Sequence, residues 1–229
     1  MMKGYESFLF GSVARGDNDE NSDTDVLIVY EGDVPSLETR EKAKSTISMG
    51  LGVKCSFAEY TQGHLDSMFS AGHLFTWHLY LEAMPLTPTG SLSETGNTFS
   101  RPAPYENALV DASNFGRLAN AAHNSLLHGS KSVTYEAGIA YVALRNIGMC
   151  LSACFSESFY FSRQSPFLLS SLLGIEPSCT PAMYDKLVSA RHSSQRGFDY
   201  AQLDRKELML SISLACDWAN KIIEAANDY

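Results

Sequence analysis

Two aspartates near the start of the sequence, Asp23 and Asp25, have the type and spacing to hold a divalent metal ion. Side chains at positions i and i+2 of an extended strand point to the same face, so both carboxylates would leave the strand in one direction. Mg²⁺ prefers hard oxygen ligands and keeps positions for water and substrate phosphates. The pair therefore predicts a site for Mg²⁺, or for Mn²⁺, that a nucleoside triphosphate shares.

A glycine-serine pair, Gly11-Ser12, precedes the aspartates and could contact the phosphates. Glycine lets the backbone turn sharply and lets a ligand approach the main chain. Ser12 is a favoured N-cap type, which predicts a short helix from Val13, and the free N–H groups at a helix start attract phosphate. A triphosphate held beside metal-binding carboxylates indicates nucleotidyl transfer with release of pyrophosphate.

Two strands must position these groups. We expect a short buried strand over 5–10, stopped by Gly11, and a central strand over 26–30, where β-branched and apolar residues follow one another. Residues 17–22 are polar and turn-forming. A solvated acidic turn between two strands is the simpler interpretation of the aspartates alone, but it leaves the Gly-Ser pair unexplained.

The joint pattern resembles the minimal nucleotidyltransferases of the DNA polymerase β superfamily over about the first 90 residues. The resemblance rests on three runs of the sequence: Phe10-Gly11-Ser12, Ala14-Arg15-Gly16 and Ser22-Asp23-Thr24-Asp25-Val26. In that family the Gly-Ser pair contacts the nucleotide phosphates, and both aspartates hold metal and serve catalysis.

The resemblance implies those roles for Gly11, Ser12, Asp23 and Asp25. It also makes Ser22 part of the nucleotide-binding motif. Arg15 is a candidate phosphate contact that could equally lie on the surface.

One departure from the family pattern concerns a third carboxylate, which the family carries on a later strand. The matching strand here is 53–60, and the expected aspartate falls on Ser56, a neutral and poor Mg²⁺ ligand. Glu59 has the opposite parity and faces the other way on a regular strand, unless a bulge redirects it. A carboxylate from elsewhere, such as Glu136 or Glu157, could complete the site. Alternatively, the site binds metal-nucleotide and transfers slowly or not at all.

The composition limits the partners and the compartment. The 229 residues carry a net charge of −9 without a run of Lys and Arg, which disfavours a groove for long DNA or RNA. The five cysteines are odd in number and lie mostly in apolar contexts, as expected of free thiols in a reducing cytoplasm rather than of disulfides or a zinc site. No signal peptide and no apolar run of about 20 residues is evident, so we expect no membrane span.

The sequence predicts an α+β protein, with a small mixed-sheet nucleotidyltransferase domain followed by an antiparallel helical bundle. We expect the first domain over 1–90, a Ser-, Thr-, Gly- and Pro-rich linker over 91–104 and the bundle over 105–229. The bundle resembles HEPN or nucleotidyltransferase substrate-binding domains more loosely. The nuclease motif of some HEPN domains is not met, because Cys150 stands where that motif has a histidine after its arginine, here Arg145.

The predicted function is Mg²⁺-dependent transfer of an NMP from an NTP to an acceptor hydroxyl on a small molecule or a protein. Arg191 and Arg196 are candidate contacts for phosphate or for an acidic acceptor group, and salt bridges within the bundle are the alternative for such arginines. We expect a homodimer through the bundle. The main rival function is a catalytically impaired nucleotide-binding or toxin–antitoxin-like module, and another is an interaction protein that does not bind nucleotide.

Overall fold

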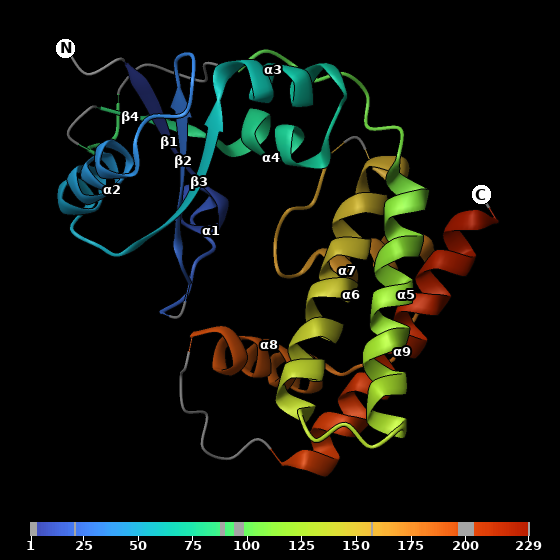
Figure 1. Cartoon of the computed structure of the whole chain (residues 1–229). Helices are drawn as coiled ribbons and strands as arrows, with labels where there is room; N and C mark the ends of the chain where they lie inside the picture. The colour runs from blue at the N-terminus through green and yellow to red at the C-terminus, as the bar shows by residue number, and fades with distance from the viewer. Residues whose placement is uncertain are drawn as a thin grey trace. The chain divides into compact units, whose positions relative to one another are not determined.

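The computed structural model describes residues 4–20, 22–87, 90–93, 99–156, 158–196 and 204–228, with the backbone alone at 195 and 196. The chain divides into two compact units, Met1–Glu106 and Asn107–Tyr229. A mixed sheet lies in the first unit and helices make up the second, so the predicted α+β class is confirmed (Figure 1).

The first unit contains a four-stranded sheet in the order β3-β2-β1-β4. β1 pairs antiparallel with both β2 and β4, whereas β2 and β3 run parallel and are connected through α2. The elements of this unit are β1 (Tyr5–Phe10), α1 (Gly11–Arg15), β2 (Thr24–Tyr30), α2 (Leu37–Leu51), β3 (Cys55–Thr61), α3 (Gln62–Ser70), α4 (Leu74–Glu82) and β4 (Met84–Leu86).

The sheet is covered on both faces, which is why its central strand is apolar from Val26 to Tyr30. On one face Leu27 and Val29 pack with side chains of α3 and α4, such as Leu65 and Leu79. On the other face the alternate residues of the strand pack against Ile47 of α2 and against α1. From Val26 to Tyr30 β2 is at most 2% exposed, and burying each large apolar side chain stabilises the fold by about 2 kcal/mol.

Residues 99–106 belong to the first unit and pack on its helices. The Phe99 ring stacks on Phe69 and lies 4.6 Å from Phe8, centroid to centroid. The indole N–H of Trp77 donates to the carbonyl of Ala103 at 3.0 Å. This segment therefore contributes to the core formed by α3, α4 and the sheet, although its composition is that of a linker.

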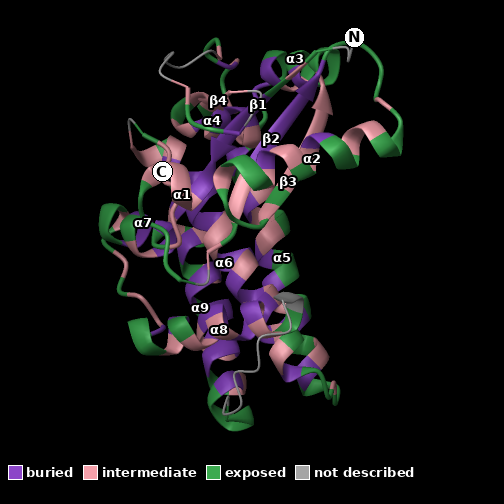
Figure 2. Ribbon diagram, turned by 90° about the vertical axis from the view of Figure 1, so that its left-hand side faces the viewer, coloured by how far each residue is buried: buried purple, intermediate pink, exposed green. Residues whose placement is uncertain are grey.

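The second unit is a helical bundle in which α6 is central. Its elements are α5 (Ala108–Leu127), α6 (Val133–Phe155), α7 (Ser165–Leu173), α8 (Pro181–Arg196) and α9 (Arg205–Asn227). Buried residues recur along α5, α6 and α9, where the ribbon is purple in Figure 2. Asp204 caps the last helix, because its carboxylate accepts from the backbone N–H of Glu207 at 2.9 Å.

Helix α6 is the one helix of the described residues that is long and apolar enough to cross a membrane. Its most apolar window is 61% buried inside the protein, and the helix packs against α5, α7, α8 and α9. Its apolar character is thus explained by its place in the bundle core.

Candidate functional site

The candidate site begins where β1 ends and the chain turns at Gly11. Gly11 has φ +77°, a conformation that residues with a side chain rarely adopt. A Cβ atom at this position would lie 2.7 Å from Oδ2 of Asp25, so the backbone of the turn lies directly against that carboxylate. Only glycine meets both requirements, and the structure thereby brings together the two motifs that are separate in the sequence.

The predicted helix after the turn exists but begins earlier than expected. Helix α1 spans Gly11–Arg15 with Phe10 as its N-cap, and no side chain caps it. Ser12 therefore lies in the first turn of α1 and is not the N-cap, so its predicted capping role is wrong. The helix ends at Gly16, whose N–H bonds back to Ser12 and Val13.

The sheet register places Asp25 between the two other strands of the site. Phe10 of β1 and Ser56 of β3 are the partners of Asp25 on its two sides. Asp23 lies just before the strand and is exposed, whereas Asp25 is half-buried. Paired residues project from the same face of a sheet, so Ser56 lies directly beside Asp25 on the face that holds its carboxylate.

Two hydrogen bonds between Ser22 and Asp19 hold the loop between α1 and β2. The Ser22 hydroxyl donates to the Asp19 carboxylate at 2.9 Å and accepts from the backbone N–H of Asp19 at 2.9 Å. Ser22 thus shapes the turn that leads into the aspartate strand.

Arg15, the candidate phosphate contact, already has carboxylate partners. Its Nη1 donates to Glu82 at 2.6 Å, and its Nε lies 3.2 Å from both carboxylate oxygens of Asp17. His78 also contacts Glu82, with Nε2 2.7 Å from the same oxygen that Arg15 reaches. Arg15 and Glu82 are 67 positions apart, and no pattern in the sequence predicts that they pair.

Glu59 lies on the face opposite to Asp25, as its parity predicts. Its carboxylate accepts from Arg40 at 2.8 and 2.9 Å, and Lys44 lies 2.6 Å from it. The Tyr30 hydroxyl donates to it at 2.8 Å. The hydrogen bond from Arg40, together with Lys44 and Tyr30, outweighs burial and lowers the pKa of Glu59 to about 2. This carboxylate therefore joins α2 to β3.

The two other carboxylates considered for the site, Glu136 and Glu157, belong to the second unit. Glu136 accepts from the hydroxyls of Ser125 and Ser130, at the turn between α5 and α6. Glu157 lies outside the described residues. No group of three or more His, Cys, Asp or Glu side chains that could hold a metal occurs among the described residues.

The arginines of the bundle differ in their surroundings. Arg191 lies where α8 closely approaches α6, since a Cβ on Gly138 would lie 3.1 Å from its Cα. The side chain of Arg196 lies outside the described part of the chain. Within the described residues, the buried Nε of Arg145 has no hydrogen-bond partner, and its guanidinium lies 5.7 Å from the centre of the Tyr141 ring.

The cysteines are free, as expected. Cys150, Cys179 and Cys216 are buried, but Cys154 is exposed, so the expectation of apolar surroundings does not hold for it. Burial raises the pKa of Cys179 to about 12, which leaves that thiol protonated and unreactive at neutral pH.

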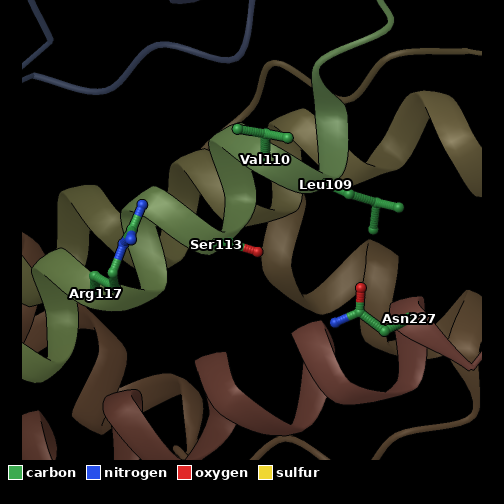
Figure 3. A pocket seen from close by; sticks show the side chains of 5 residues that line it. All are labelled: Leu109, Val110, Ser113, Arg117 and Asn227. Atoms are coloured by element: carbon green, nitrogen blue, oxygen red, sulfur yellow. The ribbon is translucent and has the colours of Figure 1, made fainter.

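Cavities occur in both units. One of about 400 Å³ lies between α5 and α9 in the bundle (Figure 3). Its lining is Leu109, Val110, Ser113, Arg117 and Asn227. Another, of about 420 Å³, lies beside Glu59 and Tyr60 at the carboxyl ends of β2 and β3. Neither cavity is lined by Asp23 or Asp25, so we assign neither to the nucleotide site.

Residues 2–71 match the family model described as nucleotidyltransferase domain. The match covers β1, the Gly-Ser turn, both aspartates and β3. The first unit is thus similar to a nucleotidyltransferase domain over these residues, and this similarity supports nucleotidyl transfer as the general class of chemistry. No curated protein and no solved structure matches the chain.

Proposed function

We propose that the first unit transfers an NMP from a nucleoside triphosphate to an acceptor hydroxyl and releases pyrophosphate. The observation that carries this proposal is the close contact between the Gly11 turn and the Asp25 carboxylate, because a turn that can bind phosphate and a carboxylate that can bind metal then lie side by side. In the reaction the acceptor hydroxyl gives up its proton to water, and its oxygen forms a bond to the α-phosphorus. The bond from that phosphorus to the bridging oxygen breaks, and pyrophosphate leaves with its electron pair.

The roles of the residues follow from their chemistry. Asp23 and Asp25 would hold Mg²⁺ or Mn²⁺, because two carboxylates are hard oxygen donors that leave positions for triphosphate oxygens and water. The bound ion would supply positive charge against the developing charge of the leaving pyrophosphate. The backbone at Gly11 and Ser12 would contact the phosphates, with Ser22 shaping the adjoining loop.

The helical unit would select the acceptor, a small molecule or a protein hydroxyl. Arg191 and Arg196 stay candidates for contacts to phosphate or to an acidic acceptor group. A resemblance to HEPN-like bundles, a homodimer through this unit and a cytoplasmic location belong to the same proposal.

The second candidate is a nucleotide-binding module that transfers slowly or not at all. The position of Ser56 favours it, because a neutral hydroxyl stands beside Asp25 where the family carries a third carboxylate. Loss of one metal-holding carboxylate lowers transition-state stabilisation by several kcal/mol, on the order of the loss of an oxyanion-hole donor.

Calorimetric binding of ATP, GTP, CTP and UTP, with and without Mg²⁺, tests the proposal. We expect Mg²⁺-dependent binding of at least one triphosphate, lost in Asp23→Ala. Asp33→Ala is the matched control, since this exposed carboxylate follows the far end of β2. Pyrophosphate release that survives Asp23→Ala would refute the assignment, and absence of binding to all four triphosphates would refute nucleotide recognition.

A further inference from the structure

One face of α4 contacts the chain on both sides of the Gly11-Ser12 turn. Phe75, His78 and Glu82 are spaced i, i+3 and i+7, so they share this face. Before the turn, the ring of Phe10 packs edge-on against Phe75 at 5.6 Å and against His78 at 5.5 Å. After the turn, Arg15 reaches Glu82 at 2.6 Å.

The contact between Arg15 and Glu82 is largely removed from water. The Glu82 side chain is 9% exposed and that of Arg15 is 20% exposed. His78 Nε2 lies 2.7 Å from the Glu82 oxygen, so this nitrogen carries the proton and donates to the carboxylate. If Arg15 moved to a phosphate, Glu82 would lose the guanidinium and keep the contact with His78, and a carboxylate with so little exposure that loses its cation is costly.

The turn itself needs such support. Helix α1 has five residues and no side-chain cap, and a helix this short is not stable by itself. Its first residue must stay against Asp25, and its last residue is the one that Glu82 holds. A shift at Arg15 would therefore be transmitted along one helical turn to the site.

We propose that Glu82 is a positioning residue for the Gly11-Ser12 turn and acts through Arg15. Arg15 stays on Glu82 when nucleotide binds, and it is a support of the turn instead of a phosphate ligand. This inference rests on the proposed function and adds to it two residues that fix the phosphate-binding backbone without touching the nucleotide.

A double-mutant cycle of Glu82→Gln, Arg15→Gln and the double variant tests the proposal on the full chain. We expect each single change to weaken Mg²⁺-nucleotide binding by about tenfold, and the double change to be no worse than either single one, because both remove the same support. The proposal would be overturned if Arg15→Gln lowered the affinity for Mg²⁺-nucleotide much more than Glu82→Gln and the two effects multiplied in the double variant. That result would show that Arg15 binds phosphate.

Glu59→Gln is the matched control, because Glu59 is also an ion-paired carboxylate with little exposure but lies on the other face of the sheet. We expect it to lower the melting temperature without weakening nucleotide binding. If Glu59→Gln and Glu82→Gln lose affinity equally, general destabilisation explains both losses. That result would refute the positioning role of Glu82.

A second measurement separates failure of this inference from failure of the proposed function. In nucleotide-free protein, the ¹⁵N amide resonances of Gly11 and Ser12 report the position of the turn directly. Glu82→Gln and Arg15→Gln should shift both resonances in the same direction, and Glu59→Gln should leave them in place. If the two resonances do not move, the positioning role is refuted even where nucleotide binding is found. If they move but no nucleotide binds, the proposed function alone is refuted.

Discussion

The paired strands β2 and β3 carry acidic residues at two places, and the two places are built differently. Asp25 is paired with Ser56, and its carboxylate lies against the Gly11 backbone. Three residues further along the same ladder, Glu59 is paired with Ile28 and is surrounded by Arg40, Lys44 and Tyr30. The odd offset puts the two carboxylates on opposite faces of the sheet.

The difference separates a carboxylate held by two cations, that of Glu59, from one that lies against the backbone of a turn, that of Asp25. Two cations hold Glu59, so its contribution is to stability. Asp25 lies beside Ser56, which is neutral, and against Gly11, where a side chain would clash with the carboxylate. This contrast predicts that changes at Glu59 affect unfolding and that changes at Asp25 affect nucleotide chemistry.

The largest expected effect is at Asp25. Replacing it as Asp25→Asn removes the charge but keeps the shape, so pyrophosphate release should fall by about 10³-fold, the scale of losing one transition-state electrostatic contact. The melting temperature should change little. A pyrophosphate assay and thermal unfolding on the same sample check this, and a variant that retains a tenth of the activity would break the contrast.

Gly11→Ala should be next in size. The new Cβ would meet the Asp25 carboxylate, and the positive φ costs about 1–2 kcal/mol for a residue with a side chain. We expect a loss of nucleotide affinity of about 100-fold, since a misplacement of about 1 Å has effects of that order. Calorimetric titration with the Mg²⁺-nucleotide measures it.

Gly16→Ala is the control for Gly11→Ala. Gly16 has nearly the same φ, +76°, but a Cβ there would meet no atom of the described chain within 4 Å. It should show the loss of stability without the loss of affinity. If both alanine variants lose affinity equally, backbone strain alone accounts for the effect, and contact with Asp25 is irrelevant.

Ser56→Asp should raise the activity of the candidate site at Asp25. A carboxylate beside Asp25 would add an oxygen donor for the metal, and we expect pyrophosphate release to rise by about tenfold. Without Mg²⁺ the variant should unfold at a lower temperature than the wild type, because like charges would then lie close together. Ser56→Asn has nearly the same shape without the charge and should show neither effect. An active wild type that gains nothing from Ser56→Asp would mean that another residue completes its site.

The smallest effect on chemistry is expected at Glu59. Glu59→Gln should lower the free energy of unfolding by about 1–3 kcal/mol, the range for hydrogen bonds to charged groups, and leave pyrophosphate release unchanged. The native pKa of Glu59 is about 2, below its ordinary value of 4.5. Its contribution is therefore fully present above pH 4.5 and is lost as the pH falls toward 2. Unfolding curves from pH 6 to 2 should converge for wild type and variant, and parallel curves would contradict this role.

Part of the site was predictable because it depends on local pattern. The first strand has the predicted bounds, Tyr5–Phe10, and the regular alternation of β3 separates Ser56 from Glu59 as parity requires. The N-cap at Asp204 is equally local. These features need only the periods of strands and helices and the preferences of a few polar residues.

The rest depends on partners that are distant in the sequence. Helix α2 buries only Ala43 and Ile47, so its apolar pattern is too weak to predict it. The strand Met84–Leu86 is three residues long, contains a proline, and is defined by its pairing with β1. The ion pair between Arg15 and Glu82 arises when α4 packs beside α1, which no spacing of charges reveals.

The packing of Phe99 determines where the first unit can be cut. A fragment that stops near residue 90 would lack Phe99 and Ala103, and would expose the apolar rings of Phe8 and Phe69 that Phe99 covers. Exposed aromatic surface of this kind promotes aggregation. Anyone who expresses the first unit alone should therefore keep the chain to Glu106, where the unit ends. Inclusion bodies from a shorter fragment would reflect that missing cover and would say nothing about its nucleotide chemistry.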